Sequence, residues 1–163
     1  MKPTVYLETT IPSYLTGRPS RDKVISGNQE ATRRWWNQDR ANFSLYVSEV
    51  VLMEAADGDP LLARARMNAL TDIPLLPLTG AAEKLALSLR KRLAMPDKAA
   101  VDALHVALAA VYGLSFLLTW NCRHINNPFQ LPKIEAACRA AGYPPPVICT
   151  PFDLLNLQPD SVP

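Results

Sequence analysis

The chain has 163 residues, of which 48% are hydrophobic and 20% are charged. These values are typical of a folded globular domain and exclude an intrinsically disordered chain. The formal net charge of +2 permits contact with nucleic acid without indicating it. No apolar run is long enough to span a bilayer, and the start MKPTVYLE lacks the pattern of a signal peptide. Three dispersed cysteines exclude a disulfide framework or a zinc site. We therefore expect a cytoplasmic protein without membrane contact.

Strand-type and helix-type patterns alternate along the first half of the chain. The expected elements are a strand at Thr4–Glu8, helices at Ile11–Leu15 and Ser26–Arg40, a strand at Ser44–Val47, and helices at Glu49–Ala56 and Leu61–Leu70. The first strand is apolar, β-branched and aromatic, which favours a central place in the sheet. Ser48 and Asp59 are the expected N-caps of the last two helices, since short polar side chains accept hydrogen bonds from first-turn N–H groups.

Basic and aromatic residues adjoin within the second helix, at Arg33–Trp36. We expect one of the two indole rings to pack inward while the arginines, with Arg40, face water. Stacking on single-stranded RNA and contact with a partner protein are alternative roles for this run.

The same alternation continues in the second half. The expected elements are an edge strand at Ile73–Leu78, a helix from Thr79 to Leu93, a helix at Asp97–Tyr112, a strand at Ser115–Thr119, a helix from Pro128 or Pro132 to Ala141, a strand at Val147–Cys149 and a turn at Pro151–Leu155. The chain shows no internal repeat or domain linker, so we predict one domain over residues 1–157 and a frayed tail at 158–163. Alternating strands and helices predict an α/β fold, with a parallel sheet covered on both faces.

The helix Asp97–Tyr112 is apolar on nearly every side, which indicates that more than one side is buried. Asp97 is its expected N-cap, and Gly113 its expected stop. Asp102 lies inside this helix, with His105 one turn further on the same face. Because an unpaired buried carboxylate is costly, Asp102 requires a cation, hydrogen-bond donors or water as a partner. We interpret His105 as a packed, hydrogen-bonded core histidine.

Polar residues follow the predicted strands at one edge of the sheet. Glu8 ends the first strand, Glu54 lies on the helix after the second, Asp102 begins the helix before the fourth, and Asn121 follows the fourth. Ligands of parallel sheets bind at this carboxyl edge. Three carboxylates and an amide suit a hard cation such as Mg²⁺ or Mn²⁺. Each residue also has a structural explanation, as a buried hydrogen-bonding acid, a strand-end acid, an exposed helical acid or a turn residue.

Four stretches resemble the motifs of the PIN domain family, and in particular the VapC-like toxins of toxin–antitoxin pairs. They are VYLETTIPSYL, YVSEVVLMEAADGDP, KAAVDALHVALAAVYG and FLLTWNCRHI, which together span residue 5 to about residue 127. The tail stretch ICTPFDLL also fits. The resemblance implies a three-layer α/β/α sandwich with a central, mostly parallel sheet. It also implies metal-dependent ribonuclease activity, with the acidic site at Glu8, Glu54, Asp102 and Asn121.

Two positions depart from the family pattern. Glu8 stands where the first acid is usually Asp, and its extra methylene moves the carboxylate by over an ångström. Asn121 stands where Asp is frequent, so the site has one formal charge fewer.

The expected function is therefore metal-dependent cleavage of RNA by a toxin that pairs with a cognate antitoxin and forms a homodimer. Glu8, Asp102 and Asn121 are the expected ligands of Mg²⁺ or Mn²⁺, while Glu54 holds a second ion or orients the attacking water. No covalent enzyme intermediate is expected.

The flanking residues Thr9, Thr119, Arg123 and His124 are the expected substrate contacts, although the two threonines can equally orient a carboxylate. Two other functions stay open. One is a catalytically weak PIN-like protein that binds RNA or an antitoxin. The other is a nucleotide-dependent α/β enzyme, against which the chain lacks a GxGxxG turn and a GxxxxGK[ST] loop.

Overall fold

Five parallel strands form the sheet of the computed structural model, which describes residues 1–155 of the chain. The strands are β1 (Thr4–Leu7), β2 (Ser44–Ser48), β3 (Leu75–Leu76), β4 (Phe116–Leu118) and β5 (Val147–Cys149). They lie in the order β3-β2-β1-β4-β5, and every pairing is parallel. The predicted central place of the first strand is confirmed, and so is the edge place of the third. Prolines 74 and 77 flank β3 and keep it short, because proline has no N–H to donate to the ladder.

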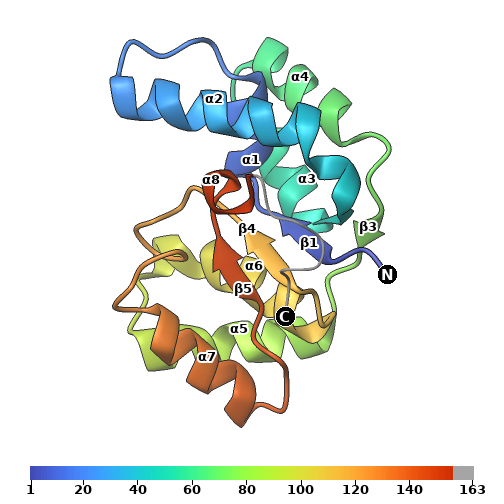
Figure 1. Ribbon diagram of the computed structural model, residues 1–163. Helices are drawn as coiled ribbons and strands as arrows, with labels where there is room; N and C mark the ends of the chain where they lie inside the picture. Colours follow the sequence, from blue (N-terminus) through green and yellow to red (C-terminus); the bar gives the residue numbers. More distant parts are fainter. Residues whose placement is uncertain (156–163) are drawn as a thin grey trace.

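Helices cover both faces of this sheet. They are α1 (Thr10–Thr16), α2 (Lys23–Gln38), α3 (Glu49–Ala55), α4 (Pro60–Leu70), α5 (Gly80–Leu93), α6 (Ala100–Val111), α7 (Leu131–Ala140) and α8 (Pro151–Leu154). In Figure 1, α5, α6 and α7 gather on one side of the strands, and α1, α2 and α4 on the other. The protein is thus a three-layer α/β/α sandwich, as the sequence predicts.

The strand order reverses beside β1. The chain moves from β1 outward to β2 and β3, then returns past β1 to β4 and β5. Right-handed crossovers therefore place the helices of the two halves on opposite faces. Such a reversal parts the connecting loops at the carboxyl ends of the two strands that flank it, here β1 and β4, where ligands of open α/β sheets bind.

The middle strands are apolar throughout. Val5, Tyr6 and Leu7 of β1 are fully buried, as are Leu117 and Leu118 of β4. Burial on both faces explains why these strands read as continuous apolar runs instead of alternating ones. The polar residues that follow them therefore start from rigid supports.

Two of the predicted helix caps are confirmed, and one helix begins earlier than predicted. Ser48 caps α3 by accepting from the Val51 N–H, and Asp59 caps α4. The helix predicted from Ser26 begins earlier, at Lys23, because Asp22 accepts hydrogen bonds from first-turn N–H groups.

The expected capping of the fourth-strand helix by Asp97 is wrong. A 3-10 turn at Asp97–Ala99 precedes α6, and no side chain caps that helix. The Asp97 carboxylate pairs instead with Arg90 in the last turn of α5, since a nearby cation competes successfully for it. The predicted stop of α6 is confirmed, with Gly113 at a φ of +64° that favours glycine.

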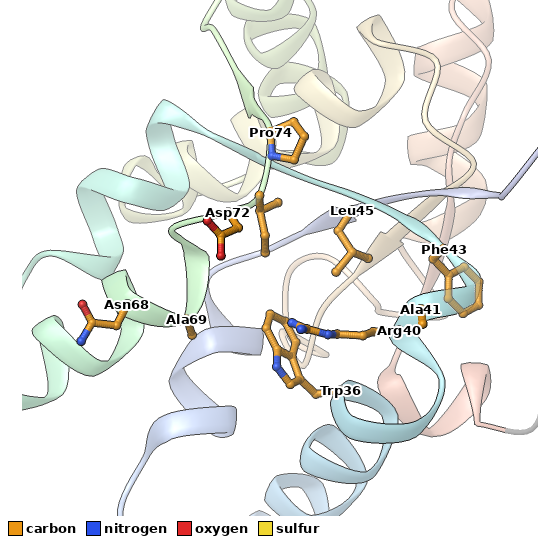
Figure 2. Close-up of a pocket in the computed structure, with 10 residues that line it drawn as sticks. Trp36, Arg40, Ala41, Phe43, Leu45, Asn68, Ala69, Asp72 and Pro74 are labelled. Atoms are coloured by element: carbon orange, nitrogen blue, oxygen red, sulfur yellow. The ribbon is translucent and has the colours of Figure 1, made fainter.

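The side chains of Arg33–Trp36 lie partly in the core and partly at the surface. Trp35 is fully buried, which confirms the expectation of one inward ring. The Arg40 guanidinium lies 4.4 Å from the Trp36 ring centroid, and both side chains line a hollow of about 580 Å³ (Figure 2). Leu45 also lines this hollow, which places it toward the amino end of β2, away from the carboxyl edge. The Arg40 cation therefore covers one face of the Trp36 ring in a cation–π contact.

Within residues 1–155, none of the helices is long and apolar enough to cross a membrane. The predicted tail at 158–163 lies outside the residues that the structure describes.

Candidate active site

Glu8 follows β1 directly and is only 4% exposed. Its Oε2 accepts two hydroxyl hydrogen bonds, from Thr10 at the start of α1 and from Thr119 just after β4 at 2.6 Å. Both hydroxyls are themselves held by backbone donors, the Trp120 N–H at 2.8 Å and the Asn121 N–H at 2.9 Å. The Glu8 carboxylate is therefore fixed between the carboxyl ends of β1 and β4, while its Oε1 accepts no hydrogen bond within the described residues.

Asp102 lies in the first turn of α6 and faces the loop after β4. The Asn121 amide nitrogen donates to Asp102 Oδ1 at 3.0 Å, and the Asn121 Oδ1 accepts from the His124 N–H at 3.0 Å. Partial burial raises the pKa of the Asp102 carboxyl, and the negative charge of Glu8 acts in the same direction. His124, His105 and the Asn121 hydrogen bond oppose this rise without cancelling it. A cation beside Asp102 would relieve both causes of the raised pKa.

Glu54, near the end of α3, accepts two hydrogen bonds on Oε1. Thr9 donates at 2.6 Å, and His105 Nε2 lies at 2.7 Å. Partial burial acts to raise the pKa of the Glu54 carboxyl, but the hydrogen bonds from His105 and Thr9 outweigh it and leave that pKa below its ordinary value. Glu54 is thus ionised at neutral pH. The His105 side chain is fully buried and makes a second hydrogen bond through Nδ1, to the Tyr6 hydroxyl at 2.7 Å.

The structure places two of the predicted acids, Glu8 and Glu54, close together. Glu8, Glu54 and His105 offer ligand atoms that all lie within 4.8 Å of one another. Asp102 lies close enough to this group for the negative charge of Glu8 to raise its pKa. Asn121 reaches this group through Asp102.

The predicted substrate contacts fall into two pairs. Thr9 and Thr119 donate their hydroxyls to carboxylates, which is the second of the two roles expected for them. Arg123 is exposed on the loop after β4, and the charge of His124 acts on Asp102. Both residues belong to the loop that also carries Asn121, and their contact with substrate stays a prediction.

The donor set fits a hard divalent cation. Glu8 Oε1, Glu54 Oε2 and Asp102 Oδ2 accept no hydrogen bond within residues 1–155, so each carboxylate keeps one oxygen free for an ion. No lysine or arginine in this range forms a salt bridge with these acids. Carboxylate oxygens without a cationic partner are the ligands that Mg²⁺ and Mn²⁺ prefer.

Sequence reasoning missed three residues of the hydrogen-bond network around these acids. Thr10 and Tyr6 were not singled out, and His105 was expected in the core but without Glu54 as its partner. A signal existed for Tyr6 and His105. Tyr6 alternates with Glu8 along one strand, and His105 lies one turn from Asp102, so both face the acidic edge.

The comparisons with known proteins agree with this architecture. The family model described as "PIN domain" matches residues 5–125. No curated protein sequence matches significantly. Among solved structures, the chain is similar to one from Rickettsia felis, described as VapBC2 bound to a DNA fragment from their promoter. The similarity covers 90% of this chain and 98% of that chain, with a TM-score of 0.57 and 13% identity. At this identity the likeness concerns the fold, whereas the family match spans most of the sequence: the chain belongs to the PIN domain family.

Proposed function

We propose that this protein is a metal-dependent endoribonuclease that uses Mg²⁺ or Mn²⁺. The observation that carries the proposal is the pair Glu8 and Glu54, whose ligand atoms lie within 4.8 Å of each other, with Asp102 near enough to feel the charge of Glu8 and no lysine or arginine in a salt bridge with any of the three within residues 1–155. Membership of the PIN domain family, whose members are generally nucleases, supports it.

The position of each residue determines its role in binding the ion. Glu8 and Asp102 hold the ion through their free oxygens. Asn121 holds the Asp102 carboxylate through its amide nitrogen and keeps one lone pair of Oδ1 as a neutral ligand. When bound, the cation supplies positive charge that stabilises the phosphoryl oxygens and makes water a better nucleophile.

Glu54 is the general base of this scheme. Its lowered pKa keeps the carboxylate ionised at neutral pH, so it can orient water and accept a proton from it. The water attacks the phosphorus in line with the leaving oxygen. Because water and not the ribose 2′-hydroxyl attacks, no product carries a 2′,3′-cyclic phosphate.

The test is cleavage of single-stranded RNA during titration with Mn²⁺ or Mg²⁺. We expect cleavage that requires the ion and is lost in Asp102→Ala, while Glu83→Ala, an exposed acid of α5, keeps it. If the wild-type protein binds RNA but leaves it intact at every metal concentration, the alternative of a catalytically weak binding protein is correct.

We further propose that the nuclease is the toxin of a toxin–antitoxin pair, with an antitoxin partner and a homodimeric state. Similarity in fold to the VapBC2 structure supports this part. Expression of the wild-type chain in a bacterial host should then arrest growth, whereas Asp102→Ala should not. Light scattering on the purified chain tests the dimer.

A further inference from the structure

A buried chain of hydrogen bonds leads from the sheet to the acidic group. Ser48 at the end of β2, Tyr6 in β1 and His105 in α6 are all fully buried. The Tyr6 hydroxyl lies 2.7 Å from Ser48 Oγ and 2.7 Å from His105 Nδ1. His105 Nε2 lies 2.7 Å from Glu54 Oε1. Four side chains from four elements thus form one continuous path.

Counting the available protons shows which group donates and which accepts at each hydrogen bond of this path. The Val51 N–H donates to Ser48 Oγ, so Ser48 accepts at that end. Within residues 1–155, the acceptor for the buried Ser48 hydroxyl proton is the Tyr6 oxygen. The Tyr6 proton then points to His105 Nδ1. Burial raises the pKa of the Tyr6 hydroxyl, so this proton stays on the oxygen.

The direction determines the His105 tautomer. An Nδ1 that accepts from Tyr6 carries no proton, so the neutral ring carries its proton on Nε2. That N–H faces Glu54 Oε1, a carboxylate oxygen that accepts. A proton on Nδ1 would instead meet the Tyr6 proton and leave a buried hydroxyl without an acceptor.

This tautomer acts on a side chain that is otherwise free to move. The Glu54 side chain is 39% exposed and lies near the end of a helix. Its Oε1 is held between His105 Nε2 and the Thr9 hydroxyl. With Oε1 occupied by two donors, Oε2 is the oxygen left for water or an ion.

We propose that His105 is a positioning residue for Glu54: Ser48 and Tyr6 fix its Nε2–H tautomer, and that N–H sets which Glu54 oxygen faces the reaction. This inference rests on the proposed nuclease function. It contrasts with a role for His105 as a metal ligand beside Glu8 and Glu54, because a ligating Nε2 must be without a proton. The two roles require opposite tautomers.

The first test reads the tautomer directly and needs no activity. Nitrogen-15 NMR of the full chain distinguishes a protonated ring nitrogen from a bare one, both without metal and with Mg²⁺. We expect His105 Nε2 to be protonated and Nδ1 bare in both states. A bare Nε2 in the wild-type protein, in either state, overturns the proposal.

The second test compares two replacements of the ring. In His105→Gln the amide nitrogen can occupy the place of Nε2 and donate to Glu54, whereas His105→Leu fills the space without a donor. We expect His105→Leu to lower kcat for RNA by about 10- to 100-fold, with little change in KM. His105→Gln should recover most of this loss.

Equal losses in the Gln and Leu variants would show that His105 only fills space and would overturn the proposal. Circular dichroism and thermal unfolding verify that both variants fold. If the wild-type protein cleaves no RNA, the nuclease function fails, while the NMR tautomer still decides whether His105 donates to Glu54.

Discussion

Thr119 Oγ1 donates to Oε2 of Glu8 at 2.6 Å, and this contact joins two strands whose positions in the sequence are 111 residues apart. Thr119 is fully buried and also accepts from the Asn121 N–H. One hydroxyl therefore orients the first acid and shapes the loop that carries the amide. The two strands that it joins are those at which the topology reverses.

Thr119→Val should destabilise the protein. Valine has nearly the same shape but leaves the Asn121 N–H without its acceptor and the buried Glu8 with one hydroxyl fewer. The expected loss is about 1–3 kcal/mol in the free energy of unfolding, measured by urea denaturation. Thr119→Ser keeps the hydroxyl and is the matched control. A valine variant as stable as the serine variant would contradict the role of this hydrogen bond.

Glu8→Asp should weaken metal binding, although it introduces the acid that is usual in the family. The hydroxyls of Thr10 and Thr119 are placed for the longer side chain. Shortening it withdraws the carboxylate from both donors. We expect about a tenfold or greater loss of Mn²⁺ affinity by calorimetry, with Glu83→Asp as the control. Tighter binding in Glu8→Asp would mean that Glu8 weakens a site shaped for Asp.

The fold was predictable because its signals are local. Apolar strand runs, caps such as Ser48 and Asp59, and prolines beside the edge strand act over a few residues. Right-handed crossovers then bring strand ends and helix starts to one edge without any knowledge of side-chain contacts. That is why the sequence could place Glu8 and Glu54 at one edge.

The pairing of individual side chains was not predictable, because it depends on tertiary distances of a few tenths of an ångström. Asp97 has the residue type of an N-cap, yet Arg90, seven residues earlier, pairs with it across the α5–α6 connection. His105 has the surroundings of a core residue, yet its Nε2 meets a carboxylate from α3. In both cases the local sequence pattern suggested one partner, and a long side chain from another element formed the contact instead.

Asp102→Asn should stabilise the metal-free protein at neutral pH. The pKa of the Asp102 carboxyl is raised in the folded state by burial and by Glu8, so its ionised form opposes folding. Asparagine removes the charge and can still accept from Asn121. The gain in urea midpoint should be present at pH 7 and vanish as the pH falls below about 3.9, where Asp102 is protonated in the unfolded chain too.

Asp72→Asn is the control for this charge removal, because Asp72 is exposed and lies outside the acidic group. A clearly lowered melting temperature of metal-free Asp102→Asn would instead identify Asp102 as a structural hydrogen-bond hub. Added Mn²⁺ should reverse the ranking and stabilise the wild-type protein more than the variant.

Glu54→Gln should lower the stability of the metal-free protein, which is the opposite effect to that of Asp102→Asn. The folded-state pKa of Glu54 lies below the ordinary value because His105 and Thr9 donate to the carboxylate, so the ionised form favours folding. Glutamine accepts the same hydrogen bonds without the charge, and the partly exposed position screens the difference, so the expected loss is small. In urea denaturation this loss should be present at pH 7 and should shrink as the pH falls through the folded-state pKa of Glu54.

Measured beside Asp102→Asn, the two variants should move the free energy of unfolding in opposite directions at pH 7, and both should converge on the wild-type value in acid. A shift in the same direction for both would show that total negative charge governs the site, and that the specific hydrogen bonds of Glu54 do not.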